Sequence, residues 1–228
     1  MSTIATALTI IHQKIKDTAQ QFNRPLDSIQ LLAVSKTRPL TDVVTAIEQG
    51  QYYFGENQLQ DALPKILALA EDERIQWHFI GTLQTNKTRL IAENFDWIQS
   101  LASLKQAQRL NAQRPSTLPP LNVCIQVNIS AEPQKTGICL AKLSEFAHAV
   151  TKLPRLHLRG LMTLPAYSED FNQQRIPFRT LHTAYCELQT QGFDLDTLSM
   201  GMTDDMVAAI AEGSTMVRVG TGIFGARG

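Results

Sequence analysis

Short apolar runs alternate with longer amphipathic stretches along the whole chain. Strand-like runs rich in Leu, Val, Ile and aromatic residues fall near residues 30–35, 52–54, 76–80, 97–100, 122–128, 156–161, 197–199 and 216–219. Apolar positions recur with helical spacing near residues 3–21, 41–49, 58–70, 86–94, 101–111, 140–152, 171–191 and 204–212. Strands that alternate with amphipathic helices predict a parallel sheet whose strands are joined by crossover helices.

Eight such strands within 228 residues favour an α/β protein with a closed (β/α)8 barrel of the TIM type, and the helix near residues 3–21 would be an extra N-terminal element. The alternative is an open, doubly wound sheet. No linker divides the sequence, so we expect a single domain over residues 1–228. Because the eighth strand falls close to the end of the sequence, we expect no second, β-rich domain.

The composition removes several classes of function. The 21 basic residues balance 21 acidic ones, so no net field attracts nucleic acid or an anionic membrane. No segment is long and apolar enough to span a bilayer. The cysteines Cys124, Cys139 and Cys186 are widely spaced, which predicts neither a disulfide framework nor a metal site. We therefore expect a cytoplasmic protein without a metal ion.

Lys36 ends the first strand, in the run LLAVSKTRP at residues 31–39. An amine at the mouth of a buried strand is partly withdrawn from water, which makes its neutral, nucleophilic form accessible. Such a lysine suits Schiff-base chemistry with a carbonyl compound. The alternative is a lysine that merely ends a strand and extends its ammonium group into water.

Polar residues and glycines gather where the predicted strands end, which is where a barrel of this kind forms its active site. The sixth strand, for example, ends in RGLMT at residues 159–163. The loops after the seventh and eighth strands could hold a phosphate, because glycines admit backbone N–H groups to an anion and hydroxyls add donors. The alternative is that the glycines only form turns and that Asp204 caps a helix. The candidate phosphate-binding residues are Ser199, Met200, Gly201, Gly220 and Thr221.

Three further polar residues lie within or at the ends of apolar runs. Arg218 is expected to point into the barrel, where a buried guanidinium needs an acceptor. That acceptor could be a carboxylate of the protein or a ring nitrogen of a bound cofactor. Asn57 and His78 end strands beside Lys36, and each could be a satisfied core residue or a contact to a bound ring.

A nucleophilic lysine that faces a phosphate site fits pyridoxal 5′-phosphate (PLP), and at this point the sequence resembles a known family. The chain is similar to the pyridoxal phosphate homeostasis proteins, also called YggS-like or proline synthetase co-transcribed proteins. The matching stretches are AVSKT (33–37), FGEN (54–57), HFIG (78–81), LQTNK (83–87), QVNI (126–129), LRGLM (158–162), SMGM (199–202), DDM (204–206), VRVGT (217–221) and IFGAR (223–227). Thr82 stands where the family often has Pro, and we do not expect it to touch the site.

The resemblance implies a single alanine-racemase-like barrel of fold type III that holds PLP. It implies that Lys36 carries the internal aldimine, that Arg218 faces the pyridine nitrogen and that Asn57 lies near the ring oxygen. It also implies that Ser199, Gly201, Gly220 and Thr221 hold the phosphate. An Arg at the ring nitrogen cannot give up a proton, so the ring is a weak electron sink, which disfavours transamination.

Three functions remain open. The first is a PLP carrier in intracellular PLP homeostasis without ordinary turnover, which would act as a monomer and could serve PLP-requiring apo-enzymes. It is favoured because no tyrosine falls where a racemase acid/base would be expected. The second is a slow or narrow amino-acid racemase. The third is a cofactor-free Schiff-base aldolase, which would be colourless.

Overall fold

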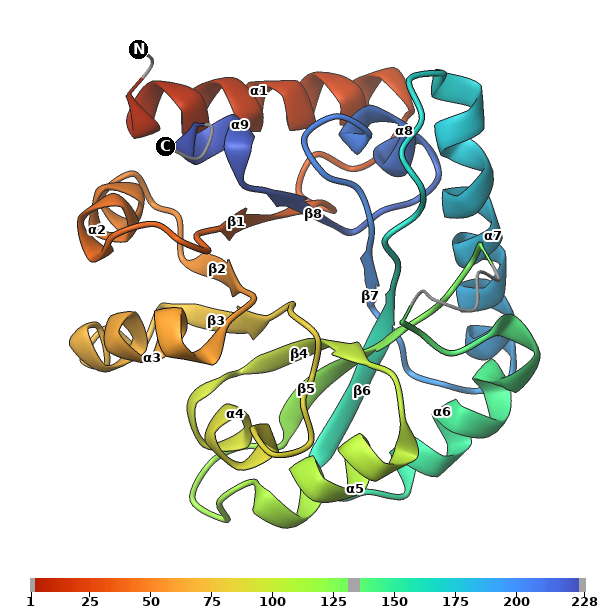
Figure 1. The fold of residues 1–228 in the computed structure, drawn as a ribbon. Coiled ribbons are helices and arrows are strands. Elements are labelled where there is room, and N and C mark those ends of the chain that lie inside the picture. Colours follow the sequence, from red (N-terminus) through yellow and green to blue (C-terminus); the bar gives the residue numbers. More distant parts are fainter. Residues whose placement is uncertain (1–2, 131–135, 226–228) are drawn as a thin grey trace.

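A computed structural model describes residues 3–130 and 136–225, and it shows a closed barrel of eight parallel strands inside a ring of helices (Figure 1). The strands follow one another around the barrel in chain order, and β1 pairs with β8 to close it. The predicted (β/α)8 barrel is therefore confirmed, and the open sheet is excluded. Ala226 and Arg227 of the last matching stretch lie outside the described residues.

The elements in chain order are α1 (Ile4–Gln21), β1 (Gln30–Val34), α2 (Leu40–Glu48), β2 (Tyr53–Glu56), α3 (Leu59–Ala68), β3 (Gln76–Phe79), α4 (Thr88–Asn94), β4 (Trp97–Leu101), α5 (Leu104–Gln113), β5 (Leu121–Gln126), the 3-10 turn η1 (Leu140–Lys142), α6 (Leu143–Thr151), β6 (Leu156–Met162), α7 (Phe171–Thr190), β7 (Thr197–Ser199), α8 (Met206–Ala211), β8 (Met216–Val219) and α9 (Thr221–Phe224). Each predicted strand is present within a few residues of its predicted place. The short helix α9 was not predicted.

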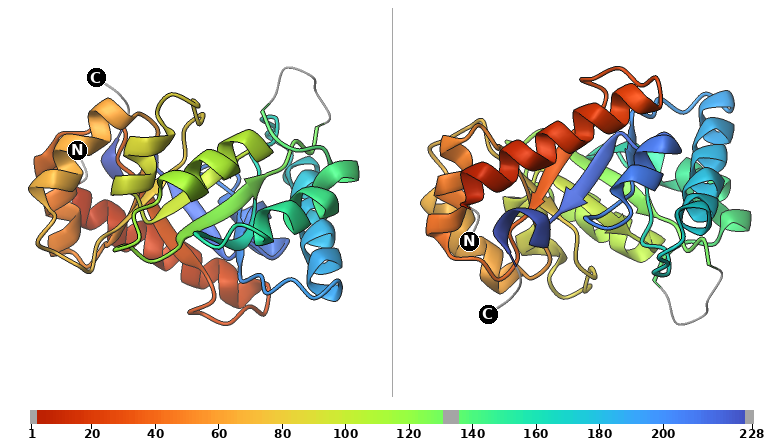
Figure 2. Two further views of the ribbon diagram at one scale, coloured as in Figure 1. Left: turned by 90° about the horizontal axis from the view of Figure 1, so that it is seen from below. Right: turned by 90° about the horizontal axis from the view of Figure 1, so that it is seen from above.

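The N-terminal helix α1 completes the helical ring beside β8 and β1. Its side chains Leu8, Ile11 and Ile15 repeat with helical spacing and are buried in the main core. α1 contacts α8, α9 and α2, and it lies across the outside of β1 and β8 (Figure 2). Because α8 and α9 are only six and four residues long, α1 covers the apolar outer surface that a full-length last helix would cover.

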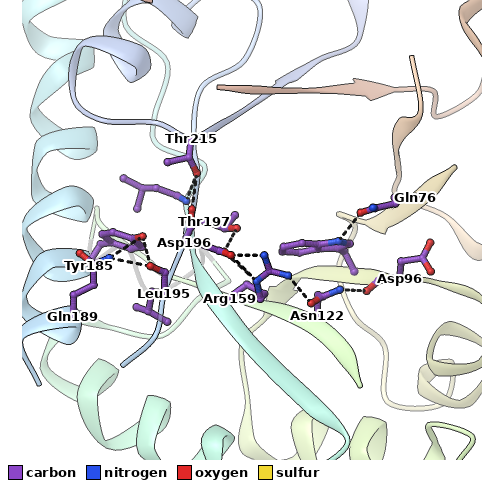
Figure 3. Close-up of polar contacts among 12 residues, drawn as sticks. Gln76, Asp96, Asn122, Arg159, Tyr185, Gln189, Leu195, Asp196, Thr197 and Thr215 are labelled. Atoms are coloured by element: carbon purple, nitrogen blue, oxygen red, sulfur yellow. Dashed lines mark hydrogen bonds and ion pairs between the residues drawn. The ribbon is translucent and has the colours of Figure 1, made fainter. Parts of the chain in front are cut away.

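A polar network around Arg159 lies near the amino-terminal ends of β4, β5 and β7 (Figure 3). Arg159 forms an ion pair with Asp196, donates to Asn122 Oδ1 at 3.0 Å, and stacks its guanidinium 4.9 Å from the Trp97 ring centre. The prediction that Arg159 belongs to the polar group at the carboxyl end of the sixth strand was therefore wrong. β6 begins at Leu156 and continues to Met162, so Arg159 lies within the strand, and its side chain serves the opposite end of the barrel.

Neither a membrane span nor a metal-binding cluster occurs within residues 3–130 and 136–225. No helix there is long and apolar enough to cross a bilayer. No three His, Cys, Asp or Glu side chains there converge as a metal site would require.

Candidate functional site

An open cavity of about 760 Å³ lies at the carboxyl ends of the strands. Its size is within the range of roughly 300–1,000 Å³ that is common for small-molecule sites. Residues from the ends of β1, β2, β3, β6, β7 and β8 contribute to it. The lining residues are Val34, Lys36, Thr37, Arg38, Asn57, Gln58, Ile80, Gly81, Thr82, Gln84, Met162, Leu164, Met202, Thr203, Asp204, Arg218, Gly220, Thr221 and Gly225.

Lys36 lies in the turn that follows β1 and lines this cavity. Its side chain is half-buried, and its ammonium group makes no hydrogen bond or ion pair with any described residue. The next residue, Thr37, has a φ of 62°, a backbone conformation that β-branched residues rarely adopt. The turn thus places at the cavity an amine that has no hydrogen-bond or ion-pair partner among the described residues.

Arg218 forms part of the cavity floor, and only 4% of the residue is exposed. It donates to Ser199 Oγ at 2.6 Å and to the Thr163 carbonyl oxygen at 2.8 Å. No carboxylate of the described residues forms an ion pair with it. Burial lowers the pKa of Arg218 to about 10, which leaves it charged at neutral pH. The floor therefore carries a cation that has no ion-pair partner among the described residues, although the Asp205 carboxylate is near enough to favour its charge. A site for an external acceptor would have such a cation.

A chain of hydrogen bonds continues from Arg218 through the barrel interior. Ser199 Oγ donates to Gln99 Oε1 at 2.6 Å, and Gln99 Nε2 donates to His78 Nδ1 at 2.9 Å. Because a guanidinium can only donate, the Ser199 hydroxyl accepts from Arg218 and donates its own hydrogen to the Gln99 carbonyl oxygen. The Gln99 amide nitrogen is then the donor to His78 Nδ1, which must accept. This order assigns the His78 proton to Nε2, which is buried without a partner.

The loops after β7 and β8 come together at one side of the cavity. Thr203 Oγ1 lies 3.5 Å from Thr221 Oγ1, and both residues line the cavity together with Gly220. Gly201 has a φ of +96°, and a Cβ there would lie 2.5 Å from Ala209 Cβ. Only glycine therefore lets the loop after β7 turn this tightly and deliver Thr203 to the cavity.

Asp204 is not a helix cap, as one interpretation of the sequence had it. α8 begins at Met206 and is preceded by Asp205, whose Oδ1 accepts from the Met202 N–H at 2.5 Å. Asp204 instead lines the cavity. Thr82 also lines the cavity, so the expectation that it would not touch the site was wrong.

The structure divides the predicted site residues into two groups. Those that line the cavity are Lys36, Asn57, Arg218, Gly220 and Thr221. Those that lie behind its wall are His78, Ser199, Met200 and Gly201. His78 is a core residue stacked on Trp97, with ring centres 5.0 Å apart, and the Ser199 hydroxyl is already committed to Gln99 and Arg218. A phosphate-binding role for Ser199, Met200 and Gly201 stays a prediction.

The predicted site residues did not include Thr203, which lines the cavity, or Gln99, which bonds to Ser199 behind the cavity wall. The only sequence feature that points to Thr203 is its position two residues after Gly201. Its neighbour Asp204 was interpreted as a possible helix cap instead. Gln99 had no signal, because a glutamine within the predicted strand near 97–100 is equally compatible with either face. Its contact with Ser199 is set by the pairing of strands around the barrel.

We expect His78 to make the folded protein less stable in mild acid. Complete burial lowers the pKa of His78 from 6.5 to about 3, so between these values the unfolded chain binds more protons than the folded one. The free energy of unfolding should therefore fall as the pH drops below about 6.5, at about 1.4 kcal/mol per pH unit, or about 2 kcal/mol by pH 5.

Urea denaturation at pH 7 and pH 5 measures this loss. His78→Phe keeps a ring against Trp97 but does not titrate, and should reduce the loss. His157→Phe, at an exposed position of β6, should retain it. An equal loss in wild type and His78→Phe would assign the acid sensitivity to other groups.

Gly81 allows the loop after β3 to pass against Asn57. A Cβ at residue 81 would lie 2.0 Å from the Asn57 carbonyl oxygen, so Gly81→Ala must push two backbone segments apart. We expect a loss of about 1–3 kcal/mol in the free energy of unfolding, measured by urea denaturation. Gly55→Ala is the matched control, because its Cβ would meet only the side-chain ends of Leu32 and Ile80 at 3.1 and 3.2 Å. A larger loss for Gly55→Ala would contradict this account.

The amino-acid sequence matches a known protein family and several curated relatives. The family model for the alanine racemase N-terminal domain matches residues 10–228. The curated pyridoxal phosphate homeostasis protein of Escherichia coli (strain K12) is 51% identical over 229 residues, covering 100% of this chain and 98% of that protein. The protein of the same name from Vibrio alginolyticus is 49% identical over 230 residues, covering 100% and 99%.

Two solved structures illustrate the structural likeness. PipY of Synechococcus elongatus PCC7942, solved with PLP bound, is 35% identical with a TM-score of 0.81, covering 92% of this chain and 99% of PipY. Alanine racemase from Corynebacterium glutamicum is 16% identical with a TM-score of 0.70, covering 98% of this chain and 61% of the racemase. The second likeness concerns the fold alone.

Proposed function

The chain belongs to the pyridoxal phosphate homeostasis proteins, within the alanine racemase N-terminal domain family, and from this premise we propose that it binds PLP in the cavity at the carboxyl ends of its strands. We propose further that it holds PLP through Lys36 and acts in PLP homeostasis. The relatives' shared name and the PLP in the PipY structure support the cofactor. One observation carries the proposed function: Lys36 and Arg218 line the same cavity. The Lys36 amine makes no hydrogen bond or ion pair with the described residues, and the Arg218 guanidinium makes no ion pair with them.

The described residues fit the chemical groups of PLP. Lys36 offers the amine for the aldehyde, and Arg218 offers a donor for the pyridine nitrogen. Thr203, Thr221 and the backbone of Gly220 offer donors for the phosphate. Asn57 Oδ1 is buried without a hydrogen-bond partner, so it is available as an acceptor for a hydroxyl of the ring. We assign Ser199 to the support of Arg218, because its hydroxyl already bonds to Arg218 and Gln99.

The proposed link between protein and cofactor is a reversible imine. With PLP bound, the Lys36 amine would be the group that forms the reversible imine with the cofactor's aldehyde, with the aldehyde oxygen released as water. Arg218 would face the pyridine nitrogen as a hydrogen-bond donor, and because a guanidinium does not give up its proton, it would leave that nitrogen unprotonated. PLP supplies an electron-accepting ring, and this environment makes that ring a weak electron sink.

Binding without ordinary turnover agrees with the groups around the cavity. A racemase needs acid/base groups on both faces of the substrate carbon. None of the four tyrosines is among the described residues that line the cavity. Tyr185, for instance, donates to the Leu195 carbonyl oxygen at 2.7 Å. Exchange of amino-acid α-protons with deuterated water at enzymatic rates would favour a racemase instead.

We also propose that the protein acts as a monomer, since the cavity of a single chain already offers groups for the aldehyde, the ring nitrogen and the phosphate of PLP. Light scattering of the PLP-loaded protein should give the mass of one chain. A stable dimer at micromolar concentration would contradict this.

The proposed function is tested by the visible absorbance of the purified protein with added PLP, followed by borohydride reduction and peptide mapping. We expect a yellow protein and a reduced pyridoxyl group on Lys36. A colourless protein without an adduct would reject the PLP proposal and make the cofactor-free Schiff-base aldolase the next function to examine.

A further inference from the structure

A buried polar cluster lies directly behind the Lys36 turn. It consists of Ser35 at the end of β1, Glu56 at the end of β2, and Asp61 and Lys65 on α3. Ser35 and Glu56 are fully buried and Lys65 is 4% exposed, whereas the Asp61 side chain is 29% exposed. None of these four residues lines the cavity, so the proposed cofactor contacts do not explain the cluster.

Lys65 is the centre of this cluster. Its Nζ donates to the Ser35 carbonyl oxygen at 3.0 Å, to Glu56 Oε1 at 2.9 Å and to Asp61 Oδ2 at 3.1 Å. An ammonium group has three N–H donors, so all of them are satisfied. Burial raises the pKa of Glu56 even though Lys65 and Ser35 donate to it, so the carboxylate depends on this cation.

Both neighbours of Lys36 in the chain are attached to this cluster. On one side, Ser35 Oγ donates to Glu56 Oε1 at 2.7 Å. On the other side, the Thr37 backbone N–H donates to Asp61 Oδ2 at 2.6 Å. Because Lys65 binds both carboxylates, it connects the residue before Lys36 to the residue after it.

The conformation of the turn needs such support. Thr37 has a φ of 62°, in the left-handed region, where a β-branched residue is strained and persists only when its surroundings hold it. The hydrogen bond to Asp61 acts on the backbone of that residue. Without it, Thr37 would relax toward an ordinary conformation, and the direction of the Lys36 side chain would change with it.

We propose that Lys65 is a positioning residue for Lys36, acting through Glu56 and Asp61 on the two residues that flank it. The proposal rests on the proposed function, since the step it supports is the attack of Lys36 on an aldehyde. A buried ion pair is often replaceable without loss of stability, so stability alone gives no reason for one at this place. Its attachment to both sides of the reactive amine does give a reason.

The test separates imine formation from binding of the ring and phosphate. Lys65→Met keeps an unbranched apolar chain and removes the ammonium. Stopped-flow absorbance with PLP gives the rate of imine formation, which we expect to fall at least about tenfold, because a displacement of about 1 Å can cost about a hundredfold. The affinity for pyridoxine 5′-phosphate, which has an alcohol in place of the aldehyde, should stay within about twofold of wild type, because it does not depend on Lys36.

Asp61 provides a second pair of variants should Lys65→Met fold poorly. Asp61→Ala removes the acceptor of the Thr37 N–H and should slow imine formation, whereas Asp61→Asn keeps an acceptor oxygen and should recover most of the rate. Glu48→Ala, at an exposed position of α2, is the control and should react like wild type.

Each outcome decides the proposal. A slower imine rate with unchanged pyridoxine 5′-phosphate binding supports positioning. Equal losses of both would indicate a general structural role for Lys65, and an unchanged imine rate would show that Lys36 needs no such support; either overturns the inference. If wild type itself forms no imine with PLP, the proposed function fails, which is a separate result.

Discussion

Lys36→Ala is expected to abolish the visible absorbance band that PLP gives with the wild-type protein and to prevent borohydride from fixing a pyridoxyl group to the chain. The reason is that Lys36 supplies the only covalent bond in the proposed complex. PLP would then be held by hydrogen bonds alone, and we expect its affinity to fall at least about tenfold, or about 1.4 kcal/mol. Absorbance titration and mass spectrometry after reduction measure the two effects.

The stability of Lys36→Ala should be close to that of wild type, because the ammonium group makes no hydrogen bond or ion pair with the described residues that its removal would break. Lys87→Ala is the matched control. Lys87 lines a smaller cavity of about 260 Å³ beside the main one and should keep the band. A band that persists in Lys36→Ala and disappears in Lys87→Ala would move the covalent link to the neighbouring cavity.

Arg218→Leu is expected to weaken PLP binding and shift its spectrum without unfolding the protein. A hydrogen bond from a charged group contributes about 1.5–3 kcal/mol, so we expect a loss of roughly ten- to a hundredfold in affinity. The substitution removes a buried charge that has no ion-pair partner among the described residues, but it leaves the Thr163 carbonyl oxygen and Ser199 Oγ without this donor. We therefore expect the free energy of unfolding to fall by no more than about 1–3 kcal/mol. Absorbance titration and urea denaturation measure these two quantities.

Arg114 is the matched control, because it is a buried arginine of the same chain that lies away from the cavity. It is also buried, but its guanidinium donates to the carbonyl oxygens of Ala92, Phe95 and Pro119, which belong to α4 and to loops away from the cavity. Arg114→Leu should therefore lower stability and leave PLP binding unchanged. If Arg218→Leu behaved like Arg114→Leu, then Arg218 would be a structural residue.

Much of the fold could be predicted because each strand and helix has its own periodicity. Ile11 and Ile15 repeat at helical spacing, and the run 31–34 is apolar on both faces, as a strand between a barrel interior and a layer of helices must be. The prediction of which residues lie at the carboxyl end of the barrel failed where the direction of a side chain could not be inferred from the local sequence pattern. Arg159 was grouped with the polar residues at the carboxyl end of the sixth strand, but its side chain contacts Asp196 and Asn122 near the beginnings of β7 and β5.

The candidate site was predictable in part for the same reason. Lys36, Arg218 and Gly220 lie at strand ends, and parallel strands in a barrel deliver their ends to one face. The inward or outward direction of Ser199 and His78 was not predictable, because a shift of one residue in a strand turns a side chain to the other face. Gln99, which bonds to both, lies on another strand and carries no local signal.

The sequence by itself determined the class of fold and indicated most of the residues that carry the proposed chemistry, among them Lys36 and Arg218. The reason is that periodicity, glycines and a lysine at the end of a strand are local properties of the chain. Only the tertiary structure decided which of these residues line the cavity, where the Arg218 guanidinium finds its partners, and that Lys65 supports the turn of Lys36. These facts depend on contacts between residues far apart in the chain. Strand register and helix packing set such contacts, and no short stretch of sequence contains them.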